Sequence, residues 1–103
     1  MGKLKLNPDP TFREKVEIHV PGGKPEPVIF TFKYRTRDEV QDFLKELEGM
    51  DDVAMIMAIA KGWELDDEFN RDNVNQLVQA FIAAPKAILE RYLQALTGTR
   101  AKN

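Results

Sequence analysis

The hydrophobic pattern of this chain changes period once, near residue 35, and that change limits the folds open to it. Apolar and charged residues alternate strictly from Lys15 to Val20, and alternation resumes from Val28 to Tyr34. A period of two is typical of a strand with one buried face. After residue 35 the apolar residues recur every three or four positions, which is the spacing of a one-sided helix. The sequence therefore predicts two strands followed by helices, an α+β arrangement.

The two predicted strands should form an N-terminal antiparallel hairpin. The segment 21–27 between them holds three prolines and two glycines, which end one strand and favour a turn. Neighbouring strands joined by a short loop usually pair with each other. An isolated hairpin is only marginally stable in water, so about four helices are expected to cover its apolar face. Three aromatic residues share the side of Val28 and are predicted to face the core: Phe30, Phe32 and Tyr34.

A capping box predicts the start of the first helix. Thr36 precedes Glu39 by three positions, and the two side chains can satisfy each other's free backbone N–H groups. Gly49 suits a left-handed cap at the helix C-terminus. The apolar residues between these points have helical spacing: Val40, Phe43, Leu44 and Leu47.

An uninterrupted apolar run from Val53 to Ala60 predicts the second helix. Asp51 or Asp52 can cap its start, and Gly62 is expected to end it. Because this helix is apolar on every side, it should lie at the centre of the core. The run is far shorter than the roughly 20 residues that cross a bilayer, so no membrane partner is expected.

Two further helices are predicted beyond the acidic loop 64–68. The third begins near Arg71 and ends before Pro85, which is well placed to open the fourth, and Gly98 ends that fourth helix. The apolar stripe of the third helix comprises Val74, Leu77, Val78, Phe81 and Ile82. The stripe of the fourth comprises Ile88, Leu89, Tyr92, Leu93 and Leu96.

The chain length fixes the expected domain organisation. At 103 residues the chain is too short for two independent cores. We therefore expect a flexible arm over residues 1–11, a single α+β domain over 12–98 and a flexible tail over 99–103. With no cysteine it needs no oxidising compartment, and we expect it in the cytoplasm.

The sequence offers little for catalysis, a cofactor or a metal ion. His19 is the only histidine and lies on the polar face of the first strand, and no serine is present. The carboxylates of loop 64–68 lack the ligand spacing of a calcium loop, so they are interpreted as favouring the following helix and solubility. We therefore expect a non-enzymatic protein without a cofactor or metal.

A binding function leaves two partner classes open. Net charge is −2, which provides no general attraction for phosphates. Basic residues nevertheless alternate with aromatic ones around the second strand, so a small nucleic-acid-associated or regulatory domain remains the alternative. Trp63 suits either the edge of a core or a protein interface. Three methionines suit either core filling or an adaptable groove: Met50, Met55 and Met57.

The order and spacing of short motifs resemble a tail assembly chaperone family of long-tailed bacteriophages. The N-terminal half carries Pro10-Thr11-Phe12, Val20-Pro21-Gly22, the run 30–38, Phe43-Leu44 and Gly62-Trp63. The similarity continues through Glu68-Phe69-Asn70, Asn73-Val74, Leu77, Ala87-Ile88, Tyr92, Leu96, Arg100 and Asn103. One departure is the segment 81–85, where the family pattern favours a Tyr-Pro-Ala type of turn.

The resemblance implies a protein that binds the helix-rich tape measure protein and keeps it soluble while tail protein polymerises around it, in the cytoplasm of the host bacterium. The major tail protein and a second copy of the chain are left open as further partners. A longer, frameshifted form is a family expectation. The residues expected to contact a protein partner all lie in the shared motifs: Trp63, Phe69, Tyr34, Arg35 and Tyr92.

Overall fold

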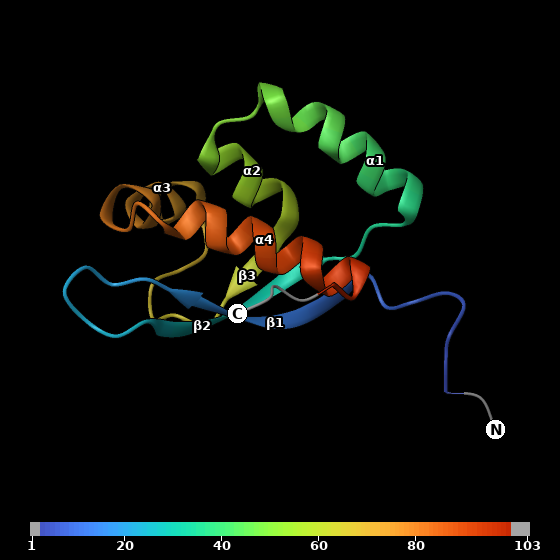
Figure 1. Cartoon of the computed structure of the whole chain (residues 1–103), viewed down its shortest axis with the longest axis horizontal. Coiled ribbons are helices and arrows are strands. Elements are labelled where there is room, and N and C mark those ends of the chain that lie inside the picture. Colours follow the sequence, from blue (N-terminus) through green and yellow to red (C-terminus); the bar gives the residue numbers. More distant parts are fainter. Residues whose placement is uncertain (1–2, 100–103) are drawn as a thin grey trace.

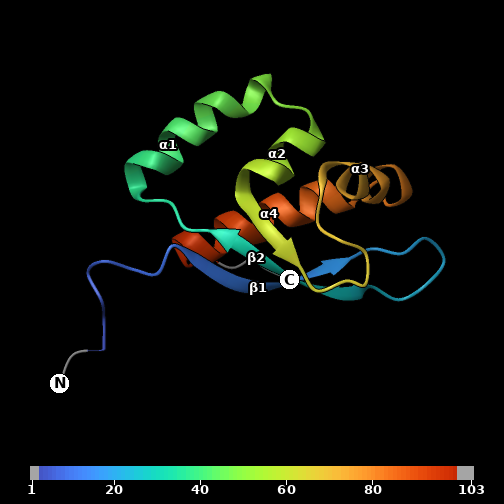
Figure 2. The ribbon, with the colours of Figure 1, turned by 180° about the vertical axis from the view of Figure 1, so that it is seen from behind.

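In the computed structural model, which describes residues 3–99, a three-stranded antiparallel sheet carries four α-helices on one face (Figure 1). The α+β prediction is therefore confirmed. The elements in chain order are β1 (Thr11–Ile18), β2 (Glu26–Lys33), α1 (Arg37–Glu46), the 3₁₀ turn η1 (Leu47–Gly49), α2 (Asp52–Ile59), β3 (Ala60–Trp63), α3 (Arg71–Ala80) and α4 (Ala84–Thr97). The strands lie in the order β1-β2-β3, and no described helix covers the other face of the sheet (Figure 2).

The hairpin forms as predicted, but β1 begins four residues earlier than the alternation suggested. Thr11 pairs with Lys33 and Ile18 pairs with Glu26 at the two ends of the ladder. The early part of β1 was missed because Glu14 stands on the inner face, where an apolar residue was expected. Its carboxylate accepts a hydrogen bond from Arg91 of α4, which compensates its partial burial.

The segment 60–63 is a third strand, whereas the apolar run predicted a helix that ends at Gly62. In the structure α2 ends at Ile59, and β3 pairs antiparallel with β2, placing Trp63 opposite Phe30. The backbone groups of this short segment are paired with those of β2. Gly62, interpreted as a helix stop, instead lies opposite Thr31 inside the strand.

The start of each of the first three helices follows its capping signal. The Thr36 hydroxyl accepts a hydrogen bond from the Glu39 backbone N–H at 3.2 Å, and the Glu39 carboxylate accepts one from the Thr36 backbone N–H at 2.8 Å. Asp51 caps α2 and Asn70 caps α3 in the same way, each at 2.8 Å. These bonds satisfy donors that the first turn of a helix leaves free.

Two details near helix ends were predicted wrongly. Gly49 has no positive φ angle, because η1 closes α1 instead of a left-handed cap; among the described glycines only Gly22 and Gly98 have positive φ. Ile82 does not belong to the third apolar stripe, since α3 ends at Ala80 and Ile82 is exposed in the turn that follows. Gly98 ends α4 with φ 77°, as predicted.

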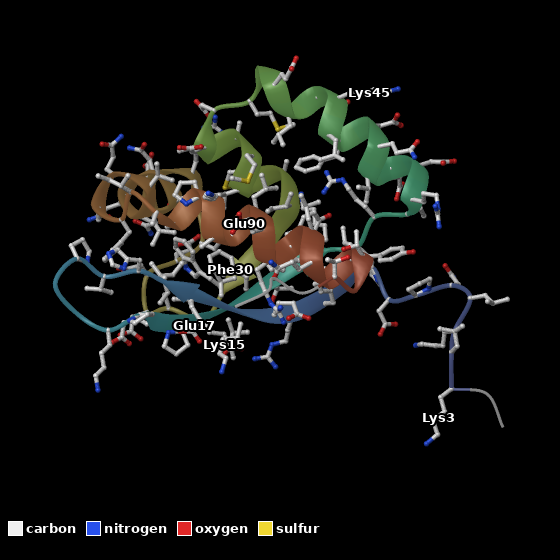
Figure 3. The ribbon with its side chains drawn as sticks, viewed as in Figure 1. Lys3, Lys15, Glu17, Phe30, Lys45 and Glu90 are labelled. Carbon is white, nitrogen blue, oxygen red and sulfur yellow. The ribbon has the colours of Figure 1, made fainter. Side chains whose placement is uncertain are left out.

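The core lies between the sheet and the helices. Figure 3 shows Phe30 directed toward the helices, while Lys15 and Glu17 lie on the opposite side of the sheet. Phe30 and Phe32 are fully buried, whereas Tyr34 lies beyond the end of β2 and is half-buried. The core residues are Val16, Ile18, Val28, Phe30, Phe32, Phe43, Met55, Ile56, Ile59, Ala60, Val74, Ala84, Ile88 and Tyr92.

Candidate protein-binding site

The structure divides the five predicted contact residues into two groups at different places along the sheet. Trp63 and Phe69 lie together beside β3, and Tyr34, Arg35 and Tyr92 lie together beyond the end of β2. Trp63 is opposite Phe30, and Tyr34 follows Phe30 by four residues, about 13 Å of extended chain. The predicted contact residues therefore belong to two separate surfaces.

Trp63 is half-buried at the margin of the core. Its indole ring packs edge-on against Phe30 at 6.0 Å between ring centroids and against Phe69 at 5.1 Å. Its Nε1–H donates a hydrogen bond to the Asp67 carbonyl oxygen at 2.7 Å. The ring is thus fixed in orientation by the core on one side and by the acidic loop on another, and only part of its surface is left for a partner.

The remaining surface of Trp63 lines a groove of about 220 Å³, which we call the Trp63 groove. It runs between the loop after β3 and helix α3. Leu77 and Phe81 contribute apolar surface from the α3 side, and Leu65 is an exposed aliphatic side chain of the loop. The full lining is Trp63, Leu65, Asp67, Asn73, Gln76, Leu77, Ala80 and Phe81.

The loop beside this groove is strongly acidic. Residues 64–68 hold four carboxylates, and Glu64 forms an ion pair with Arg13 of β1. Asn73 of α3 donates a hydrogen bond to the Glu68 carbonyl oxygen at 2.7 Å, which ties the loop to the helix. Residues 3–99 contain no group of three or more acidic, histidine or cysteine side chains placed to hold a metal ion. The groove therefore presents an apolar floor with a negative margin.

Tyr92 is the centre of the second group and has no exposed surface. Its hydroxyl donates a hydrogen bond to the Lys33 carbonyl oxygen at 2.8 Å and accepts one from Arg35 Nη1 at 2.9 Å. Burial raises the pKa of Tyr92, and the Arg35 guanidinium partly opposes that rise. Because it is enclosed, Tyr92 offers no surface to a partner and instead holds Arg35.

Arg35 and Tyr34 form the accessible part of this second group. The Arg35 guanidinium lies 4.6 Å from the centroid of the Phe43 ring, a cation–π contact that restricts the side chain further. Both residues are half-buried and line a polar groove of about 340 Å³ with carboxylates of α1. Those carboxylates belong to Glu39, Asp42 and Glu46. This surface suits polar contacts, in contrast to the Trp63 groove.

Comparison with protein families decides what kind of protein carries these surfaces. The entire chain, residues 1–103, matches the family model described as phage tail assembly chaperone. This chain belongs to that family. The resemblance inferred from the motifs is thereby confirmed, whereas comparison with curated proteins and with solved structures gave no match.

As a phage tail assembly chaperone, this protein acts during tail assembly in the host cell, and its family implies that it binds tail proteins. Within residues 3–99, no helix of the chaperone has the length and apolar character to cross a membrane.

The segment 81–85, where the motifs depart from the family pattern, leads from α3 into α4. Ile82 and Ala83 form a turn, and Pro85 occupies the first turn of α4.

The sequence of this chaperone points to Trp63 as a contact residue, but the groove around Trp63 was not predicted. Leu77 and Phe81 were assigned to an apolar stripe, and nothing in that stripe distinguishes a groove wall from a core contact. A signal was available in Trp63 and Leu65, which alternate around Glu64 as they would after a strand. It was overlooked because Gly62 was interpreted as the end of a helix.

Proposed function

We propose that this chaperone binds the tape measure protein in the bacterial cytoplasm and keeps it soluble until tail protein polymerises around it, without catalysing a reaction. Membership of the tail assembly chaperone family carries the proposal. The Trp63 groove supplies a physical means, since it exposes apolar surface beside a fixed aromatic ring. Long helices with unpaired apolar stripes aggregate, and covering those stripes prevents it.

The dimensions of the groove fit short-lived binding. An apolar cavity of about 150 Å³ accommodates a benzene ring, so about 220 Å³ accommodates one or two aliphatic side chains of a helix. Contacts of this size give modest affinity, because association itself costs free energy that a small apolar patch barely offsets. A chaperone whose client must later leave for the growing tail benefits from such weak binding.

The structure gives less support to the nucleic-acid alternative. Arg13 is paired with Glu64, and Arg35 is bonded to Tyr92 and stacked on Phe43. Phe30 and Phe32, two of the aromatic rings that would stack on bases, are buried in the core. A mobility-shift measurement at low salt, where phosphate contacts are strongest, distinguishes the two functions.

The test of the proposed function is co-expression with the tape measure protein. We expect the partner to be soluble with the chaperone and to aggregate without it. Trp63→Ala should weaken binding by about 2 kcal/mol or more, roughly thirtyfold, because interface energy concentrates in a few aromatic anchors. It should also lower the melting temperature, since the ring contacts Phe30 of the core.

Leu44→Ser is the control for this variant. Leu44 is an exposed apolar residue of α1 outside the Trp63 groove, so its replacement should leave binding unchanged and lower the melting temperature only slightly, through the weaker helix propensity of serine. Equal solubility of the tape measure protein with and without the chaperone would disprove the proposed function. If folded Trp63→Ala keeps full affinity, Trp63 serves the core alone and the partner binds elsewhere.

A further inference from the structure

The N-terminal residues Lys3–Leu6, which we call the arm, hold two leucines that do not join the core. Leu4 is 86% exposed and Leu6 is 94% exposed. They alternate with Lys3 and Lys5, so an extended backbone places the leucines on one side and the lysines on the other. The arm combines an apolar side with a positively charged side.

The Trp63 groove is complementary to the arm in both respects. Its floor is formed by apolar side chains, and the loop beside it holds four carboxylates within residues 64–68, of which Glu64 is already paired with Arg13 and Asp67 lines the groove.

Lys5 forms an exposed ion pair with Asp9 of its own chain at 3.1 Å, a contact of little stability. Leucine side chains seated on Leu77 and Phe81 would leave Lys3 free to approach the acidic loop. They would also let Lys5 exchange Asp9 for a carboxylate of that loop. The groove volume of about 220 Å³ is sufficient for one or two leucine side chains.

The arm and the groove of one chain lie at opposite ends of the molecule. The arm leaves the end of the sheet where Thr11 pairs with Lys33 and extends away from α3 (Figures 1 and 2). The backbone N–H of Tyr34 donates to the Pro10 carbonyl oxygen at 2.9 Å, which fixes the point of departure. An arm that leaves the sheet at this end is placed to meet the groove of another molecule.

The position of β3 adds room for such an approach. In the part of the chain that the structure describes, β3 is an edge strand paired only with β2. An exposed strand edge accepts extended segments of other chains. The groove lies next to the end of this edge at Trp63, so an extended arm could lie along both.

We propose that the arm of one copy occupies the Trp63 groove of a second copy, so that the chaperone forms a homodimer by reciprocal exchange of arms. Each dimer contains two arm–groove contacts of two leucines each. Because these contacts are small, the dissociation constant should lie at about 10 µM to 1 mM. It should rise with salt, since salt screens the attraction between lysines and carboxylates.

Sedimentation equilibrium of the full chain tests this proposal. The protein concentration is varied from about one-tenth to about ten times the dissociation constant. We expect a concentration-dependent dimer. The arm variant Leu4→Ser/Leu6→Ser and the groove variant Leu65→Ser should each raise the dissociation constant about tenfold or more. Leu44→Ser is the matched control. Leu44 and Leu65 are similarly exposed, at 44% and 40%, but Leu44 lies outside the groove. It should leave the dimer unchanged.

A mixing experiment separates exchange between chains from folding back within one chain. The arm variant keeps an intact groove, and the groove variant keeps an intact arm, so a mixture regains one of the two contacts. We expect the mixture to associate more tightly than either variant alone. Three results would each overturn the proposal. The wild-type chain could remain monomeric at every concentration, or Leu44→Ser could weaken the dimer as much as Leu65→Ser does. The third result is a mixture of the two variants that associates no more tightly than either variant alone.

This experiment needs no tail protein. Its failure would leave the proposed binding of the tape measure protein untouched. Conversely, a dimer that forms by arm exchange would stand even if that binding were disproved. The two results are therefore independent.

Discussion

At the scale of single residues, Tyr92 shows which part of a side chain's role the sequence can predict. Its place in the apolar stripe of the last helix predicted burial, and the structure encloses it fully. Its hydroxyl partners could not be predicted, because Lys33 and Arg35 lie more than fifty residues away in the sequence. Periodicity reports which face of a helix is apolar, but not which distant backbone group that face will meet.

Tyr92→Phe should destabilise the protein by about 1–2 kcal/mol at neutral pH. The variant leaves the Lys33 carbonyl oxygen and Arg35 without their partner, and a buried group without a hydrogen bond is costly. Burial raises the pKa of Tyr92, so the folded state favours the neutral phenol. The wild-type advantage is therefore full below the unfolded pKa of about 10 and is lost as pH rises from there through the folded pKa.

Urea unfolding of wild type and Tyr92→Phe at pH values below and above about 10 measures this difference. Other titrating groups are common to both proteins, so the difference between them isolates Tyr92. We expect the gap in unfolding free energy to shrink at the higher pH. A gap that stays constant across this range would show that Tyr92 does not titrate differently in the folded state.

At the scale of elements, local sequence signals predicted helix starts well and the third strand poorly. Caps at Thr36, Asp51 and Asn70 depend on neighbouring residues and are visible in sequence. Strand β3 depends on pairing with β2, about thirty residues earlier, which outweighs the helical tendency of an apolar run. The candidate site was partly missed for the same reason, since the Trp63 groove begins where β3 ends.

Helix α2 should tolerate charge differently at two adjacent positions. Ile56 is fully buried, so Ile56→Asp places a charge without a partner in the core and should cost at least about 3–5 kcal/mol, a large part of a small domain's stability. A helix that is apolar on every side predicts the same result for Met57→Asp. Met57 is only partly buried, however, so its variant should remain folded with a lower melting temperature.

Thermal unfolding followed by circular dichroism compares the two variants directly. A cooperative transition for Ile56→Asp close to that of wild type would show that α2 is not central to the core. Unfolding of both variants would show that the partial exposure of position 57 does not let water solvate the aspartate.

At the scale of the whole molecule, charge is unevenly distributed although the net charge is small. Residues 37–52 hold seven acidic and two basic side chains, whereas residues 3–35 hold seven basic and four acidic ones. The loop 64–68 adds four carboxylates beside the Trp63 groove. One chain thus carries both a basic N-terminal segment and acidic surfaces, which favours contacts between copies and between the groove and basic, apolar segments of a client.

If arm exchange and client binding use the same groove, they must compete. A client that binds only free grooves has an apparent dissociation constant divided by the fraction of grooves that are free. With about one groove in ten free, the arm variant Leu4→Ser/Leu6→Ser should bind a tape measure segment about tenfold more tightly than wild type. At low chaperone concentration, where dimers dissociate, the two proteins should bind it equally.

Calorimetric titration of a tape measure segment into each protein, at high and at low chaperone concentration, measures this effect. Leu44→Ser should behave as wild type at both concentrations, because Leu44 takes no part in the groove. An arm variant that binds the segment no more tightly than wild type at high concentration would show that the client and the arm occupy different surfaces. Because linkage is reciprocal, the client should also dissociate the wild-type dimer, which sedimentation of the mixture reports independently.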